Sequence, residues 1–402
     1  PRQALPGRDE PALDFHRGRR PRKVLLRPDR PGLDPLVRFE PPPDSGVLRR
    51  FGPGSSVDLP GYMAKISQAE FEVWLDTLNV SIPRPPPGRK FGDLPDPSFA
   101  RLDSLFVKTY YISVRPEALA DVIAAIPRAP GCEVTVEANP DDVTAELLDA
   151  LVAGGVNRIS LGVQSMVPHV LTSLGRTHDP ANVERAVELV RASGIATFNL
   201  DLIYGAAAES PADWERTLDG ALALGPPHVS AYGLTVEPGT GLAADPARHP
   251  DDDDQADKYL AAADRLEAAG LAWYEISNWA EPGHECRHNR LYWSMGEYQA
   301  FGCAGHSHRD GRRFWNLRTP ERYIDAVASG ATVEAAGERL DAPERRVEAL
   351  QLAVRTRDGA PVEAFSPSNL EVLDGLVERH GDRVVLTTRG RLLANEVALR
   401  IE

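Results

Sequence analysis

The sequence predicts an α/β fold, in which a complete or partial (βα) barrel is followed by a small helical, winged-helix-like domain. Three observations support this prediction. From residue 102 onward, strand-like segments alternate with helix-like segments at intervals of about 30 to 45 residues, which is typical of βα units and a parallel sheet. The helical segments end at Gly, which readily adopts the left-handed conformation that closes a helix. Past residue 320 this rhythm stops. A doubly wound sheet is the alternative that the alternation leaves open.

The first predicted unit is the strand 102–107 with the helix 115–126, which has Pro116 in its first turn. Four more units follow, and a last strand is expected over 272–280. Their strands and helices are 132–140 with 145–155, 158–165 with 181–194, 196–205 with 213–225, and 228–238 with 257–270.

Beyond residue 320 the sequence predicts helices over 344–356 and 369–380, then a strand, a turn and a last helix within 382–401. This part has no basic recognition helix, so we expect it to pack against the barrel and not to bind nucleic acid.

The first 101 residues have a different composition, since they hold about half of the 35 Pro and many Arg. Scattered apolar residues without a period cannot bury enough surface to offset the entropy of ordering. We therefore predict a disordered or aberrant N-terminal region, with one short amphipathic helix over 69–78. The expected domains are 1–101, a barrel over 102–318 and a C-terminal helical domain over 319–402.

Charge and composition exclude several function classes. The net charge of −14 argues against general binding to nucleic acid or to anionic membranes. No apolar run is long enough for a membrane span, and the first residues show no signal-peptide pattern. The three Cys have no disulfide-scaffold spacing, which favours a reducing compartment. The sequence thus predicts a cytoplasmic protein.

Polar residues follow the predicted strands at their C-terminal ends, where barrels of this kind place their chemistry. A carboxylate can bind an amino group, Arg a carboxylate, and Asp or Gln the hydroxyls of a ribose. One such residue alone is more often an ordinary helix cap or loop contact, but recurrence in successive units favours a ligand site. The residues are Glu137, Gln164, Arg176 and Asp201.

The segment "HECRHNRLYW" (284–293) concentrates residues that are rare in the chain, with two of the 10 His and one of the three Cys. By residue type alone, His288 and Asn289 could cap a strand while Tyr292 and Trp293 fill a core. A zinc module is another possibility, because Cys and His supply tetrahedral ligands. Its candidate ligands are His284, Cys286, His288, Cys303, His306 and His308.

The motifs "VEANPDD", "RISLGVQS", "LGRTHD", "NLDLIYG", "HVSAYGLTVEPGT", "WYEISNWA", "CRHNRLYW" and "FGCAGHSH" occur in this order. Together they resemble the HemW-type heme chaperones, which are related to the oxygen-independent coproporphyrinogen III oxidases within the radical S-adenosylmethionine (SAM) proteins. The resemblance covers residues 102–402. It implies a partial TIM-like barrel with a C-terminal helical domain.

The resemblance also implies ligands and a role. It assigns contacts to SAM to Glu137, Gln164, Arg176, Asp201 and Gly233, and contacts to heme to His288, Asn289, Tyr292 and Trp293. His288 is the candidate ligand to the heme iron. The expected role is to bind heme and transfer it to acceptor proteins. The alternatives are a coproporphyrinogen III oxidase of porphyrin biosynthesis and, from another class, a zinc module or an inactive scaffold.

The sequence departs from that family in one respect. The family carries a Cys-x3-Cys-x2-Cys loop whose thiolates hold a [4Fe–4S] cluster, with SAM on the fourth iron. Here the only cysteines are Cys132, Cys286 and Cys303. The family's Gly-rich turn is replaced by "KTYYISV" (108–114), whose side chains would crowd SAM. We therefore expect no cluster, weak SAM binding and no radical catalysis, and we assign no catalytic residue.

Two origins could explain this departure. The N-terminal region could come from a shifted reading frame or a wrong start, or the chain could have diverged and lost the cluster. An upstream reading frame that encodes the three-Cys loop would decide for the first hypothesis.

Overall fold

The computed structural model describes residues 116–402 apart from 127 and 239, together with four short strands upstream. The chain divides into two compact units. In the first, strands β1 (Val24–Leu25), β2 (Val37–Phe39) and β3 (Val57–Asp58) pair in that order as an antiparallel sheet. The predictions for the rest of 1–101, including the helix over 69–78, and for the segment 108–114 lie outside the described residues.

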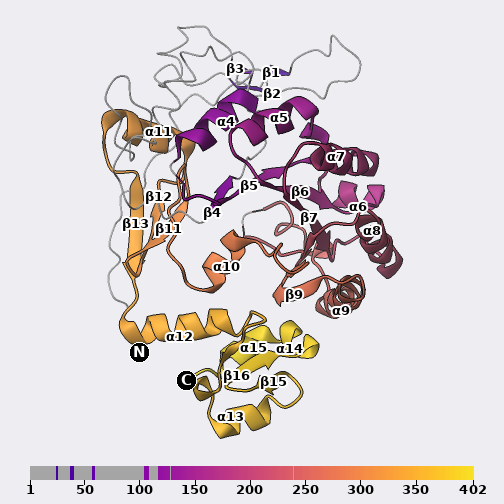
Figure 1. Ribbon diagram of the computed structural model, residues 1–402, viewed down its shortest axis with the longest axis vertical. Helices are drawn as coiled ribbons and strands as arrows, with labels where there is room; N and C mark the ends of the chain where they lie inside the picture. The colour runs from indigo at the N-terminus through magenta and orange to yellow at the C-terminus, as the bar shows by residue number, and fades with distance from the viewer. Residues whose placement is uncertain are drawn as a thin grey trace, which may run out of the picture. The chain divides into compact units, whose positions relative to one another are not determined.

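The second unit is built on a seven-stranded sheet (Figure 1). Its first five strands pair in parallel, as the sequence predicts, and its last two are antiparallel. In sheet order the strands are β4 (Ser104–Val107), β5 (Glu133–Ala138), β6 (Arg158–Gln164), β7 (Thr197–Tyr204), β8 (His228–Gly233), β10 (Asn278–Ala280) and β9 (Ala272–Glu275).

The expected single strand over 272–280 is wrong, because the segment forms the hairpin of β9 and β10. The Glu275 side chain accepts a hydrogen bond from the backbone N of Ser277 at 3.0 Å and a second one from Asn278. This local contact turns the chain where the sequence pattern alone continues as a strand.

Helices connect the parallel strands at the predicted places. They are α4 (Pro116–Ala125), α5 (Ala145–Ala153), α6 (Pro168–Ser173), α7 (Pro180–Ala192), α8 (Pro211–Ala223) and α9 (Asp252–Ala268). Four of them begin at a side chain that accepts from the first turn, namely Thr144, Asp179, Ser210 and Asp251. Because Asp251 caps α9, that helix begins five residues before the predicted 257. The short α6 was not predicted.

The two faces of the parallel sheet differ in chemistry. Ile159, Leu161, Leu200 and Val229 are fully buried and share one apolar core with the helices. Since side chains alternate along a strand, the residues between them point to the other face. There the side chains are polar and hydrogen-bonded to one another: Ser160, Asn199, Asp201, His228 and Ser230. The inner face of the barrel is therefore a polar layer.

The C-terminal part adds two small antiparallel sheets. The first, with strands β11 (His306–Arg309), β12 (Arg312–Asn316) and β13 (Glu334–Arg339), was not predicted. The second orders its strands β14 (Ala360–Pro361), β16 (Arg383–Leu386) and β15 (Val377–His380). The helices are α10 (Arg287–Trp293), α11 (Pro320–Ser329), α12 (Ala342–Ala353), α13 (Pro367–Val372), α14 (Thr388–Leu392) and α15 (Ala394–Ala398).

Two of the three predictions for this part hold. Helix α12 lies within the predicted 344–356 apart from its first turn, and β16 with α14 and α15 forms the predicted strand, turn and helix. The helix predicted over 369–380 is wrong, since α13 ends at Val372 and β15 begins at Val377. Gly375, at φ 77°, turns the chain between them, and β15 then pairs with β16.

Candidate functional site

The residues predicted to bind SAM lie along the C-terminal halves of the strands. Glu137 is next to last in β5, Gln164 and Gly233 are the last residues of β6 and β8, and Asp201 lies in the second half of β7. The sheet register pairs Glu137 with Ser160 and Asp201 with Ser230. Arg176, in contrast, lies in the loop between α6 and α7 and is half-exposed.

Gln164 has an unusual backbone conformation for a buried non-glycine residue, with φ at 63°. Its side chain folds back over Gly162, because a Cβ added there would lie 2.9 Å from Gln164 Nε2. Strained conformations of this kind persist where the surrounding structure fixes them, and they gather at ligand sites. The position is therefore a site candidate on structural grounds as well.

Both carboxylate oxygens of Asp201 accept hydrogen bonds from the polar layer. Ser160 Oγ donates to Oδ2 at 2.7 Å, and Asn199 Nδ2 donates to Oδ1 at 2.8 Å. These bonds fix the orientation of the carboxylate, which is a suitable acceptor for ribose hydroxyls or an amino group.

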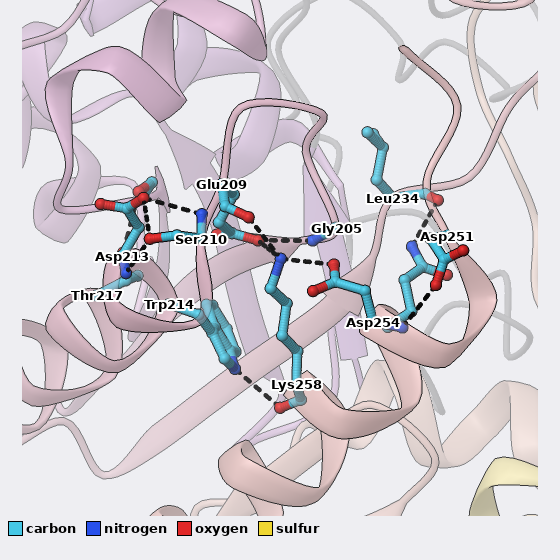
Figure 2. A network of polar contacts seen from close by, with 12 residues as sticks. Gly205, Glu209, Ser210, Asp213, Trp214, Thr217, Leu234, Asp251, Asp254 and Lys258 are labelled. Atoms are coloured by element: carbon cyan, nitrogen blue, oxygen red, sulfur yellow. Dashed lines mark hydrogen bonds and ion pairs between the residues drawn. The ribbon is translucent and has the colours of Figure 1, made fainter. Parts of the chain in front are cut away.

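A buried ion-pair network supports the loop that follows β7 (Figure 2). Lys258 Nζ, on α9, lies 3.1 Å from Glu209 Oε2 and 2.7 Å from Asp254 Oδ2. Glu209 Oε2 also accepts from Gly205 N at 2.7 Å, at the end of β7. Burial raises the pKa of Glu209, and Lys258 opposes that shift. The sequence analysis missed this network, although a Lys beside Tyr259 on the apolar side of α9 was an available sign.

The same helix also supports the end of β8. Gln255 Nε2 donates to Leu234 O at 3.0 Å, and it packs so closely on Gly205 that a Cβ there would lie 2.5 Å from it. Gly205, at φ 87°, is therefore required both by its conformation and by this contact. Helix α9 thus holds the ends of two neighbouring strands in place.

The segment that leads into α10 lies at the opposite ends of the same strands. Arg158, the first residue of β6, donates from Nη1 to His284 O at 2.8 Å. Thr197, the first residue of β7, contacts His284 Nδ1 through its Oγ1 at 2.7 Å. Glu133, the first residue of β5, accepts from the backbone N of Arg287 at 3.0 Å. The start of helix α10 therefore lies against the N-terminal ends of the barrel strands.

Helix α10 presents the motif residues on two faces, because residues four apart share a face. His288 and Tyr292 lie on one, with ring centroids 4.7 Å apart, and Tyr292 is 41% exposed. Asn289 and Trp293 lie on the other, where both oppose the rise that burial causes in the pKa of Glu275. Trp293 also lines a cavity of about 210 Å³ together with Ala353 and residues 356–359. The four residues therefore do not form one continuous surface.

Burial lowers the pKa of His288 to about 4. Its imidazole is consequently neutral at pH 7, which is the form that coordinates a metal. Burial also raises the pKa of Cys286 to about 12, with the Glu133 carboxylate adding to the effect. Cys286 is therefore a thiol at pH 7, and Sγ lies 3.6 Å from Glu133 Oε1 as a donor.

The residues present do not fit a [4Fe–4S] cluster, which needs three thiolates from one short loop. Cys132 and Cys286 are buried at separate places and Cys303 is exposed. Nor does the structure assemble the zinc ligands considered above. Within residues 116–402 as described, no three His, Cys, Asp or Glu side chains gather so that they could hold a metal ion. His308, one of the candidates, uses Nδ1 to contact Gly296 O at 2.9 Å.

In the described part of the chain, no helix has both the length and the apolar character that crossing a membrane requires.

A family model described as the radical SAM superfamily matches residues 109–221. The heme chaperone HemW of Mycobacterium tuberculosis (strain CDC 1551 / Oshkosh) is 42% identical over 318 residues, covering 74% of this chain and 81% of that protein. HemW of Escherichia coli (strain K12) is 35% identical, covering 69% and 77%, and HemW of Bacillus subtilis (strain 168) is 34% identical, covering 66% and 74%.

Among solved structures, the coproporphyrinogen III oxidase HemN of Escherichia coli, a radical SAM enzyme, matches with a TM-score of 0.67. The match covers 83% of each chain at 19% identity, so it speaks for the fold alone. The predicted partial barrel is confirmed by this likeness and by the parallel sheet.

Proposed function

This chain belongs to the HemW heme-chaperone family of radical SAM proteins, and from that premise we propose that it binds heme and passes it to acceptor proteins. The observation that carries the proposal is the pair of His288 and Tyr292 on one face of α10, a neutral imidazole beside an accessible aromatic ring. In this proposal heme is the transported ligand, and α10 forms its binding site.

Each motif residue has a separate part in this proposal. His288 coordinates the iron, since His is a common proximal ligand of heme. Tyr292 supplies flat apolar surface for the macrocycle. Asn289 and Trp293 hold the helix through Glu275, so that the heme-binding face stays fixed. Cys286 is disfavoured as the ligand because it is buried as a protonated thiol.

A heme titration tests the proposal. The chain is titrated with hemin and followed at the Soret band, beside the variants His288→Ala, Cys286→Ala and His306→Ala. We expect His288→Ala to weaken binding by at least about tenfold and to shift the band, because even second-shell changes at metal sites cost that much. The matched control is His306, an exposed histidine stacked on Trp315, whose loss should change little.

An unchanged band in His288→Ala, with loss in Cys286→Ala, would move the ligand to sulfur. No change in any variant would remove α10 from the heme site altogether.

The rim residues Glu137, Gln164, Arg176, Asp201 and Gly233 are our proposed contacts to SAM, and we expect binding there to be weak. The cluster that would chelate the methionine end has no ligand set in this chain. Coproporphyrinogen oxidation, the alternative family activity, depends on that cluster, so we favour the chaperone role. We also propose the domain boundaries given above, a cytoplasmic location and acceptor proteins of unspecified identity.

A further inference from the structure

Three buried polar side chains connect Asn289 of α10 with Asp201 through the inner face of the barrel. Asn289 Nδ2 lies 3.4 Å from the Tyr274 hydroxyl, which lies 2.9 Å from His228 Nε2. His228 Nδ1 lies 2.6 Å from Asn199 Oδ1, and Asn199 Nδ2 lies 2.8 Å from Asp201 Oδ1. Tyr274, His228 and Asn199 are each less than 5% exposed. We call these five residues the relay.

The direction of every bond in the relay follows from its Asp201 end. A carboxylate only accepts, so the amide nitrogen of Asn199 must face Asp201 and its oxygen must face His228. His228 therefore donates from Nδ1. Its complete burial, with Arg158 and His284 nearby, holds the pKa of His228 well below its usual range, so the ring is neutral and Nε2 accepts. Tyr274 must donate to Nε2, and its oxygen accepts from Asn289.

We propose that the relay is a positioning device, through which the rim carboxylate Asp201 sets the hydrogen bond that orients Asn289 and with it the heme-binding face of α10. This inference rests on the proposed heme site at His288. Tyr274 and His228 are its positioning residues and do not touch heme. Reversing the relay would exchange the His228 tautomer, turn the Tyr274 hydroxyl and flip the Asn199 amide, which requires Asp201 to donate a proton instead of accepting one. A change at Asp201 is therefore able to reach α10 through the bond directions.

The first test reads the relay directly and needs no heme. Nitrogen-15 NMR of the chain labelled in its histidines reports which ring nitrogen of His228 carries the proton, with His228→Gln to assign the signal. We expect the Nδ1–H tautomer, whereas imidazole in water prefers Nε2–H. In Asp201→Asn the acceptor-only end is gone, so both tautomers should appear. An Nε2–H tautomer in the parent chain, or no response to Asp201→Asn, would overturn the proposal.

The second test measures coupling through a double-mutant cycle on heme affinity, with Tyr274→Phe, Asp201→Asn and both together. Tyr274→Phe keeps the ring but removes the donor to His228, so we expect heme binding to weaken roughly tenfold, the net size of one buried hydrogen bond. The double variant should lose clearly less than the product of the two single losses, since either change breaks the same chain of bonds.

The matched control is Tyr259→Phe, which removes another buried hydroxyl, bonded to Ile276 O at 3.0 Å and outside the relay. In the double variant with Asp201→Asn, the loss of heme affinity should equal the product of the two single losses. If the losses of heme affinity in Tyr274→Phe and Asp201→Asn also multiply independently, the two residues are not coupled. That result would refute the relay but not the heme site. If Tyr274→Phe does not fold, Asn289→Ala, on the half-buried face of α10, takes its place in the cycle. A parent chain that binds no heme would refute the proposed function, and the tautomer measurement would still decide on the relay.

Discussion

The two ends of the barrel strands are built differently, although the same strands supply both. At the C-terminal ends, strand residues such as Asp201 line the rim, and α9 supports the loops from outside through Lys258. At the N-terminal ends, the segment 284–289 lies across the strands and is held by their first residues, Arg158, Thr197 and Glu133. In barrels of this type the C-terminal face carries chemistry and the other face carries stability.

This difference teaches that the proposed heme segment occupies the end where stability is expected. Its anchoring side chains and its proposed binding side chains lie on adjacent faces of one short helix. A change that loosens the anchors should therefore alter cargo binding, whereas a change at a rim residue outside the relay should mainly alter stability and SAM binding. The predictions that follow test this division, from the largest effect to the smallest.

Lys258→Met should destabilise the C-terminal ends of the strands without affecting α10. It leaves Glu209 buried without its cation, and breaking a buried ion pair on one side costs about 3–5 kcal/mol. Urea unfolding followed by circular dichroism measures the loss. The control is Arg265→Met, which removes only exposed ion pairs between α8 and α9 and should cost about 1 kcal/mol or less. Equal losses in the two variants would show that the network is not the support we infer.

The pH dependence of the α10 end should differ from that of an ordinary histidine. The pKa of His288 is about 4 in the folded chain, below its unfolded value near 6.5. The unfolded chain therefore binds a proton that the folded one refuses, so this contribution to stability is complete above pH 6.5 and is lost as pH falls towards 4. Heme affinity should stay level from pH 8 to pH 5.

Heme titrations and urea unfolding at pH 8, 6.5 and 5 check both statements, with His288→Ala as the reference for each. A drop in heme affinity centred near pH 6.5 would contradict the burial that we assign to His288.

The smallest effect is expected for reconstitution with iron and sulfide, which should form no cluster in this chain. Under anaerobic conditions we expect no [4Fe–4S] absorbance and well under one iron per chain, because three thiolates are not available in one loop. Iron and sulfide analysis on the purified chain measures this. About four of each per chain would show that the three scattered cysteines do form a cluster site.

The sequence was sufficient for features that depend on local pattern. The alternation of strands and helices predicted the parallel sheet, and the strand ends predicted where Glu137, Gln164 and Asp201 lie, because residues that end parallel strands share one edge of a sheet. The order of the motifs was enough to name the residues of the proposed heme segment. It could not show at which end of the barrel strands that segment lies.

Features that depend on distant contacts could not be predicted. The position of α10 is decided by Glu133 and Arg158, which lie more than 120 residues before their contacts in the chain. The relay joins Asn199, His228 and Tyr274 from three strands, and each looks like an isolated polar residue in its own strand. The turn at Gly375 was hidden because the apolar residues on both sides of it fit a helical period by chance.

The protonated state of Cys286 has a consequence for the proposed heme binding. Heme reacts with peroxide, and the damage to nearby sulfur proceeds through the thiolate. Because burial raises the pKa of Cys286 to about 12, the thiol is almost entirely protonated at pH 7. Two positions before the proposed iron ligand, the chain therefore carries a sulfur that is nearly inert to oxidants. Burial and the nearby Glu133 carboxylate, which also accepts from the start of α10, would thus protect that helix from the chemistry of the proposed heme cargo.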